Sequence, residues 1–238
     1  MRRRMWCTFH SRLVPLRDRG PIVTFSFDDF PRSALTNGAS IVERYGGRAT
    51  YYVAMGLMGK KNDLGEQFSN TDLEQLVERG HEVASHTFSH LSAQHSPIEV
   101  FRRDVDRGEQ AIRESIAAGP SNNFAYPYGE VTLTAKKQLG PSMRSCRGTC
   151  GGLNGPQVDL NLLRANSLYG DLDQLDAAKK LILENESRKS WLIFYSHDVV
   201  EQPSPFGCTP ALLEAVVSFL AERAAKMITV ADVVRELS

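Results

Sequence analysis

The chain has 238 residues, of which 42% are hydrophobic, and its 28 Lys and Arg balance its 28 Asp and Glu. This composition is typical of a globular protein with enough chain to bury a sizeable core. The zero net charge gives no general electrostatic basis for binding nucleic acid or an anionic membrane, and no stretch is long and apolar enough to span a membrane. We therefore expect no nucleic-acid partner and no membrane span.

The N-terminus starts with a cluster of arginines, as a signal peptide does, but charged residues interrupt residues 5–20, where the apolar core of such a peptide would lie. We therefore predict a cytoplasmic protein, with residues 1–19 as an N-terminal extension and residues 20–238 as one domain. The cysteines have neither the spacing of a zinc site nor that of a redox pair. In the cytoplasm they would stay reduced, and we expect buried thiols at Cys7, Cys146, Cys150 and Cys208.

The first half of the chain alternates strand-like and helical segments. In chain order, it predicts a strand at 21–27, a helix at 33–45, a strand at 49–54, a helix ending near residue 80, a strand at 81–85, and a long helix ending near residue 117. Capping boxes at 71–74 and 96–99 are expected to begin the second and third of these helices.

The second half continues the alternation. It predicts a strand at 123–126, a helix at 131–139, a strand at 142–146, a glycine-rich loop at 147–159, a strand at 162–168, a helix at 172–187, a strand at 191–195, a helix from Thr209-Pro210 to about 224, a strand at 227–229, and a helix at 230–237.

Repeated alternation of strand and helix implies a parallel sheet with helical crossovers. Seven or eight such units without a break in composition favour a closed or nearly closed α/β barrel in a single domain. An open doubly wound sheet is the alternative. In either architecture, catalytic groups are expected at the C-terminal ends of the strands.

Polar side chains come directly after three of the predicted strands. Asp28 and Asp29 end the first strand, His86 and His90 follow the third, and His197 follows the strand at 191–195. On one helical turn His86 and His90 would face the same side, and two histidines with one carboxylate form a common catalytic metal site. Adjacent carboxylates suit divided labour, in which one binds the cation and the other is the general base. His197 has the side chain best suited to protonate a leaving group near neutral pH.

These residues lie in motifs that give the chain a family resemblance. It resembles the polysaccharide deacetylase family, also called the NodB-homology or carbohydrate esterase family 4 domain, whose fold is a distorted (β/α)7 barrel. The resemblance covers roughly residues 20–235. The matching segments are Ser26-Phe27-Asp28-Asp29-Phe30, His86-Thr87-Phe88-Ser89-His90, Ala125-Tyr126-Pro127-Tyr128-Gly129 and Tyr195-Ser196-His197.

The resemblance implies a role for each matching residue and an acetylated carbohydrate as the substrate. Asp28 is implied as the general base, His197 as the general acid, and the backbone N–H of Tyr128 as an oxyanion donor, with Pro127 and Tyr195 also at the substrate. The implied ligands of one divalent metal ion are Asp29, His86 and His90. Zinc fits two imidazoles and a carboxylate, and cobalt, nickel or iron fit similarly.

The chain also departs from the family pattern. Phe30 replaces the glycine of the first motif, Ala125 replaces the arginine of the third, and Tyr195 replaces the leucine of the fifth. The fourth motif, an Asp near a Trp, has no clear match. Three arginines could supply the missing charge, namely Arg144, Arg147 and Arg164. Asp198, next to His197, would point the opposite way on a strand and is expected to be structural.

Two other functions are compatible with the sequence. A metal-dependent amidase acting on a small non-sugar amide would use the same set of residues. A catalytically silent carbohydrate-binding relative would keep the barrel without its tuning residues, although an intact Asp28 favours an active enzyme. Activity on an acetylated oligosaccharide that is lost with a chelator would separate these functions.

Overall fold

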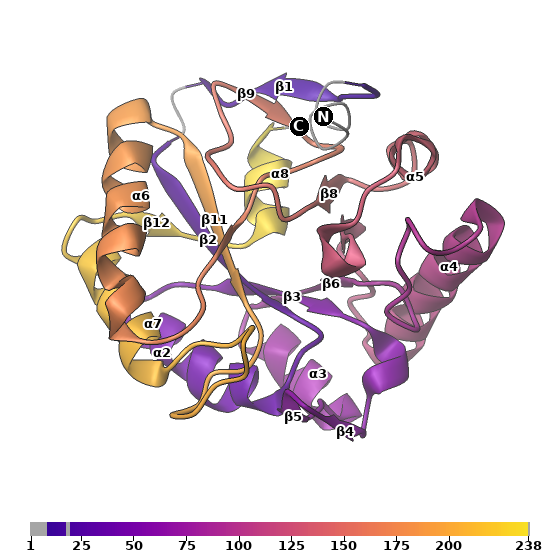
Figure 1. Cartoon of the computed structure of the whole chain (residues 1–238), viewed down its shortest axis with the longest axis horizontal. Helices are drawn as coiled ribbons and strands as arrows, with labels where there is room; N and C mark the ends of the chain where they lie inside the picture. Colours follow the sequence, from indigo (N-terminus) through magenta and orange to yellow (C-terminus); the bar gives the residue numbers. More distant parts are fainter. Residues whose placement is uncertain (1–8, 18–19, 238) are drawn as a thin grey trace.

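A computed structural model describes residues 9–17 and 20–237 (Figure 1). Its main sheet runs in the order β10-β11-β2-β3-β6-β7-β8, with every pairing parallel, and β12 adds to β2. The sheet curls into the predicted distorted (β/α)7 barrel. Its strands are β2 (Ile22–Asp28), β3 (Ala49–Val53), β6 (Glu82–Ser85), β7 (Asn123–Ala125), β8 (Ser145–Arg147), β10 (Asn166–Ser167), β11 (Trp191–Ser196) and β12 (Lys226–Met227).

Helices cover the outside of this sheet (Figure 1). They are η2, a π-helix (Ala34–Ala39) continued by α2 (Ser40–Arg44), then α3 (Asn70–Glu78), α4 (Ile98–Ser115), α5 (Leu133–Leu139), α6 (Leu175–Arg188), α7 (Pro210–Ala221) and α8 (Val230–Leu237). Single turns η3 (Met55–Leu57), η4 (Pro127–Gly129) and η5 (Leu172–Gln174) lie between the longer elements. The largest apolar core packs β2, β3 and β11 against α2, α6 and α7. Strand β2 is buried along its whole length, as its continuous apolar sequence predicts.

The predicted order of elements is confirmed, but two helix starts are wrong. Helix α3 begins two residues earlier than predicted, in a capping box between Ser69 and Asp72, in which the side chain of Asp72 accepts a hydrogen bond from the Ser69 backbone at 2.8 Å. Helix α4 begins after Pro97 without a side-chain cap, so the capping box expected at Ser96 does not form.

The predicted loop 147–159 is also wrong at both ends. Arg147 is the last residue of β8, and Gln157–Asp159 form β9, which pairs antiparallel with β1 (Leu13–Pro15). The predicted strand at 162–168 is reduced to the two residues of β10. A short hairpin of β4 (Lys61–Asn62) and β5 (Gly65–Glu66) is a further element that the sequence pattern did not predict.

Part of the predicted N-terminal extension packs on the domain. Besides the pairing of β1 with β9, the guanidinium of Arg12 donates to the carbonyl oxygens of Gly140 and Met143 at 3.0 and 2.9 Å. Among the described cysteines, Cys146 and Cys208 are buried free thiols, and Cys150 is half-buried. Cys7 lies outside the described residues. Within residues 9–17 and 20–237, no helix combines the length and apolarity needed to cross a membrane.

Candidate active site

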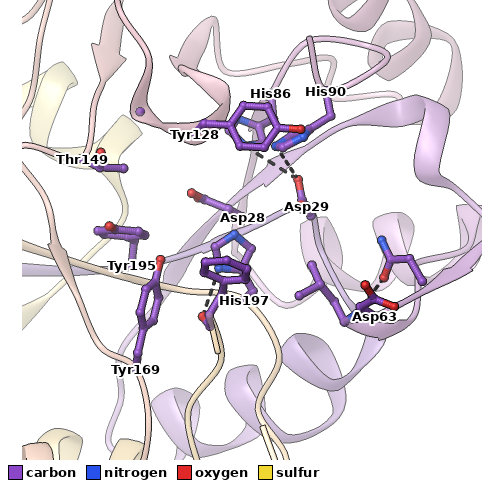
Figure 2. Close-up of a pocket in the computed structure, with 14 residues that line it drawn as sticks. Asp28, Asp29, Asp63, His86, His90, Tyr128, Thr149, Tyr169, Tyr195 and His197 are labelled. Atoms are coloured by element: carbon purple, nitrogen blue, oxygen red, sulfur yellow. Dashed lines mark hydrogen bonds and ion pairs between the residues drawn. The ribbon is translucent and has the colours of Figure 1, made fainter. Parts of the chain in front are cut away.

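The predicted site residues meet at the carboxyl ends of the parallel strands, where the barrel architecture places catalytic groups. Asp28 is the last residue of β2, His86 follows β6, Tyr128 lies in the turn after β7, and His197 follows β11. These four residues and Asp29 line one cavity of about 500 Å³ (Figure 2). The fold therefore brings together side chains that are up to 169 positions apart in the sequence.

Asp29, His86 and His90 form a candidate metal site. Their ligand atoms all lie within 4.8 Å of one another, and Oδ1 of Asp29 is 3.2 Å from Nε2 of His90 and 3.8 Å from Nε2 of His86. The same Asp29 oxygen is buried without a hydrogen-bond partner. A buried carboxylate oxygen facing two imidazole nitrogens is the environment that a divalent cation would satisfy, so these residues fit the ion that the family resemblance implies.

The protonation of His86 also suits a ligand. Burial lowers the pKa of His86 to about 3, so the imidazole is neutral at physiological pH. Its Nδ1 lies 2.8 Å from the carbonyl oxygen of Ala125 and donates to it in the neutral ring. This hydrogen bond leaves the lone pair on Nε2 facing Asp29, which is how a backbone carbonyl commonly orients a metal-binding histidine.

The expectation that His86 and His90 share a helical turn is wrong. The segment between them is a bent loop in which Thr87 and His90 have positive φ angles of 63° and 56°. The carboxylate of Asp104 in α4 holds the bend by accepting from the backbone N–H groups of Phe88 and Ser89, at 3.1 and 2.8 Å. The two imidazoles therefore meet through loop geometry, with ring centroids 4.9 Å apart.

The backbone of the first motif is strained in the same way. Asp29 and Phe30 have φ angles of 62° and 67°, in the left-handed region that costs a non-glycine residue about 1–2 kcal/mol. The family glycine at this position avoids that cost, whereas Phe30 is fully buried and stacks on Phe68 with ring centroids 5.0 Å apart. Its edge also meets Tyr51 at 5.0 Å. Aromatic packing thus offsets the strain that a glycine would remove.

A buried ion pair holds Asp28, the predicted base. Its Oδ2 lies 2.6 Å from a guanidinium nitrogen of Arg147, and the two side chains are 5% and 0% exposed. The guanidinium also lies against the rings of Tyr52 and Tyr195, 4.9 and 5.1 Å from their centroids. Burial alone would raise the pKa of Asp28, but Arg147, with smaller contributions from His86 and His197, holds that pKa below its ordinary value. Asp28 is therefore ionised at neutral pH despite its burial.

Arg147 reaches Asp28 from the strand next to the one where the family has its arginine. Ala125 in β7 and Arg147 in β8 are register partners, so their side chains point to the same face of the sheet. Alanine at position 125 leaves room on this face for the long side chain of its neighbour. Of the three arginines considered from the sequence, Arg147 makes the contact, whereas Arg144 and Arg164 are exposed.

His197, the predicted acid, is half-buried at the cavity. Its Nδ1 is 3.1 Å from the carbonyl oxygen of Phe206, so a backbone carbonyl is the hydrogen-bond partner of this imidazole. The neighbouring Asp198 is buried and accepts from the N–H and the hydroxyl of Ser204 at 2.8 and 2.6 Å. Asp198 therefore shapes the loop that carries Phe206, as its expected structural role requires.

The cavity has lining residues that the sequence did not reveal. Tyr169 and Phe206 join the predicted Tyr195 around His197, with Tyr169 at centroid distances of 5.4 Å from Tyr195 and 6.1 Å from His197. Asn62, Asp63 and Leu64 approach from the β4–β5 hairpin, and Thr149 follows β8. The glycine and turn residues at 62–65 predict a turn, but nothing in the sequence says that this turn faces the site.

The three predicted substrate-binding residues differ in position. Tyr195 and Tyr128 both line the cavity. Tyr128 is 65% exposed, and its ring meets that of His90 edge-on at 4.5 Å. Pro127 is buried and is not among the residues that line this cavity, so it shapes the turn that presents Tyr128.

An α/β barrel with this cluster at its strand ends has clear relatives. The model of the family described as polysaccharide deacetylase matches residues 17–141, which is more than half of the chain. The chain therefore belongs to the polysaccharide deacetylase family, whose members are hydrolases that act on the acetyl groups of carbohydrates. No curated protein sequence matches the chain.

Solved structures of the same fold agree with this assignment. A T48 deacetylase with substrate has a TM-score of 0.59 at 19% identity, over 91% of this chain and 92% of that one. A family 4 acetyl xylan esterase from Clostridium thermocellum in complex with a cobalt ion has a TM-score of 0.60 at 19% identity, over 90% and 91%. A peptidoglycan deacetylase from Bacillus subtilis has a TM-score of 0.55 at 17% identity, over 92% and 93%. At these identities the likeness establishes the fold.

Proposed function

We propose that the protein is a metal-dependent hydrolase that removes N- or O-acetyl groups from a carbohydrate. The observation that carries the proposal is the separation of two adjacent carboxylates into different environments. Asp29 lies with His86 and His90 as a candidate ligand set, whereas Asp28 is held as a buried, ionised group by Arg147. A ligand and a base that are distinct but adjacent are what metal-assisted acyl hydrolysis requires.

Each residue then has one task. When bound at Asp29, His86 and His90, a divalent cation supplies the positive charge that activates a water molecule and stabilises the oxyanion. Asp28 accepts the proton of the attacking water, because Arg147 keeps its carboxylate ionised. His197 donates a proton to the leaving nitrogen or oxygen, which is a poor leaving group without one.

The remaining cavity residues would hold the substrate. The backbone N–H of Tyr128 is assigned to the oxyanion on the family resemblance, and the position of Tyr128 beside His90 supports this role. Tyr195, in the family's leucine position, would face the acyl group, and its hydroxyl makes that wall more polar than leucine would.

The cobalt ion of the Clostridium thermocellum esterase is compatible with the expected zinc or with cobalt, nickel or iron here. The cytoplasmic location stays a prediction.

The test is hydrolysis of an N-acetylglucosamine oligomer and of acetylated xylan, with acetate release measured before and after treatment with a chelator. We expect acetate release that is lost on chelation and restored by adding one equivalent of Zn²⁺ or Co²⁺. Release that survives complete removal of metal would refute the metal-dependent mechanism. Activity on a small acetanilide with none on either carbohydrate would identify the protein as a metal-dependent amidase of small non-sugar amides.

A further inference from the structure

The charges that line the active-site cavity are all acidic apart from the histidines. Among its lining residues, Asp28, Asp29 and Asp63 carry carboxylates, and no Lys or Arg is present. Asp28 is paired with Arg147, and Asp29 belongs to the candidate ligand set. Asp63 is exposed and has neither a hydrogen bond nor an ion pair from its side chain to any described residue. Its carboxylate is therefore available to a ligand in the cavity.

The hairpin that carries Asp63 is fixed by its own hydrogen bonds. At the turn, Oδ1 of Asn62 accepts from the backbone N–H of Leu64 and from the side-chain amide of Gln67, both at 2.9 Å. Gln67 in turn bridges to Pro31, two residues after Asp29. These contacts tie the turn to the segment that bears the candidate metal ligand, and Asp63 lies within that turn.

Asp63 lies away from the polar tyrosine wall of the cavity. Figure 2 shows Asp63 on the opposite side of Asp29 and His197 from Tyr169 and Tyr195. An acyl group that reacts near Asp29 and His197 therefore leaves the rest of the substrate free to extend toward the hairpin. A unit of an oligomer next to the reacting unit, and not the reacting acetyl group, would meet the Asp63 carboxylate.

The chemistry of an unpaired carboxylate at such a place favours a cation. Removing an acetyl group from an N-acetylated amino sugar leaves a basic amine, which is protonated in mildly acidic solution and more readily beside a carboxylate, whereas an O-acetylated neutral sugar leaves only a hydroxyl. We propose that Asp63 binds the ammonium group of a free amino-sugar unit beside the acetylated unit. The substrate is then an amino-sugar oligomer that is already partly N-deacetylated, and the inference rests on the proposed deacetylase function.

The other charges of the hairpin lie outside the lining of the cavity. Lys60 and Lys61 precede the turn but are not among the residues that line the cavity, and Lys61 is the register partner of Glu66 on the neighbouring strand. Glu66 is exposed on the same hairpin and also does not line the cavity. It is therefore a matched control for the loss of one negative charge near the site.

The experiment compares two substrates that differ by one acetyl group. The probes are a fully acetylated N-acetylglucosamine tetramer and the same tetramer with one free amino group, with kcat/KM expressed per acetyl group. The free energy of an exposed ion pair corresponds to a preference of about two- to fivefold, in kcat/KM, for the amine-bearing tetramer in the wild-type protein. We expect D63N to bring the ratio to about one, and D63E and E66Q to keep it. The preference should shrink when the salt concentration is raised from about 50 to about 500 mM.

A binding measurement keeps the test independent of turnover. The Kd of a fully deacetylated glucosamine tetramer, measured by calorimetry on the metal-loaded protein, should rise about two- to fivefold in D63N and stay the same in E66Q. A wild-type ratio of one or less, or a preference that D63N retains, would overturn the role of Asp63 while acetate release upholds the deacetylase function. If the wild-type protein releases acetate from neither tetramer, the proposed function fails on amino sugars and the inference fails with it.

Discussion

The ion pair between Arg147 and Asp28 makes a prediction that can be worked out from the structure. Arg147 is fully buried, and its guanidinium is 2.6 Å from the carboxylate of Asp28. Replacing it with methionine removes the charge and keeps much of the side-chain volume. Asp28 is then left as a buried carboxylate without its cation, a state that costs about 3–5 kcal/mol if the group stays ionised.

The carboxyl of Asp28 avoids most of this cost by taking up a proton. Burial raises the pKa of this group, and in the wild-type protein Arg147 is the largest influence that lowers it. Burial without a nearby cation raises the pKa of a carboxyl, so R147M should take up a proton on Asp28 at a higher pH than the wild-type protein does. For each pH unit below its pKa, a carboxyl is ionised in an about tenfold smaller fraction of the molecules. We expect kcat/KM at pH 6 to fall about tenfold or more and to recover in part toward pH 9.

The assay is the pH profile of kcat/KM on an acetylated oligosaccharide. The acid limb of R147M should move to higher pH, and the limb of R147K should move less, because lysine keeps the charge. R164M is the control, since Arg164 is exposed and does not line the cavity. An R147M acid limb that coincides with that of wild type would show that Arg147 does not set the ionisation of Asp28.

The site supports three further predictions. H197A should lose about 10²–10⁴-fold in kcat/KM, with part of the rate restored by imidazole in the buffer, and a variant at full rate would place the acid elsewhere. F30G relieves about 1–2 kcal/mol of backbone strain but loses the packing of a buried aromatic ring, which is worth about 3–5 kcal/mol. Its Tm should therefore fall by several degrees, and an unchanged or higher Tm would mean that the strain outweighs the packing. Burial raises the pKa of Asp29 to about 6, so below that pH a metal ion must displace a proton from this carboxyl in order to bind. The association constant of the metal ion, measured by calorimetry, should therefore fall about tenfold per pH unit below pH 6. A constant that is flat between pH 6 and 5 would contradict this.

The strand ends and most of the site could be predicted from the sequence because both depend on local patterns. Apolar runs such as 21–27 and 191–195 mark buried strands, and a parallel barrel brings the carboxyl ends of all its strands to one end of the molecule. The polar residues directly after these runs, Asp28 and His197, therefore had to face the same end. The position of each of these two residues follows from the strand that precedes it in the chain, so it could be predicted from the sequence.

Other parts of the site depend on contacts between distant segments. His86 and His90 meet through two positive φ angles and the carboxylate of Asp104 in α4, which spacing alone cannot distinguish from a helical turn. Arg147 looked like part of a glycine-rich loop, and its contact with Asp28 depends on the register of β7 and β8. Asp63 is carried into the cavity by a two-strand hairpin too short to leave an alternating pattern.

The division of labour between the two adjacent aspartates is the central claim, and one paired measurement tests it most directly. Metal content and kcat are determined on the same preparations of wild type, D28N and D29N. We predict that D28N keeps one equivalent of metal and loses about 10²–10⁴-fold in kcat, because a base and not a ligand is removed. D29N should lose most of the metal as well as the activity, because a ligand is removed. A D29N protein with full metal content, or a D28N protein with wild-type kcat, would contradict the assignment.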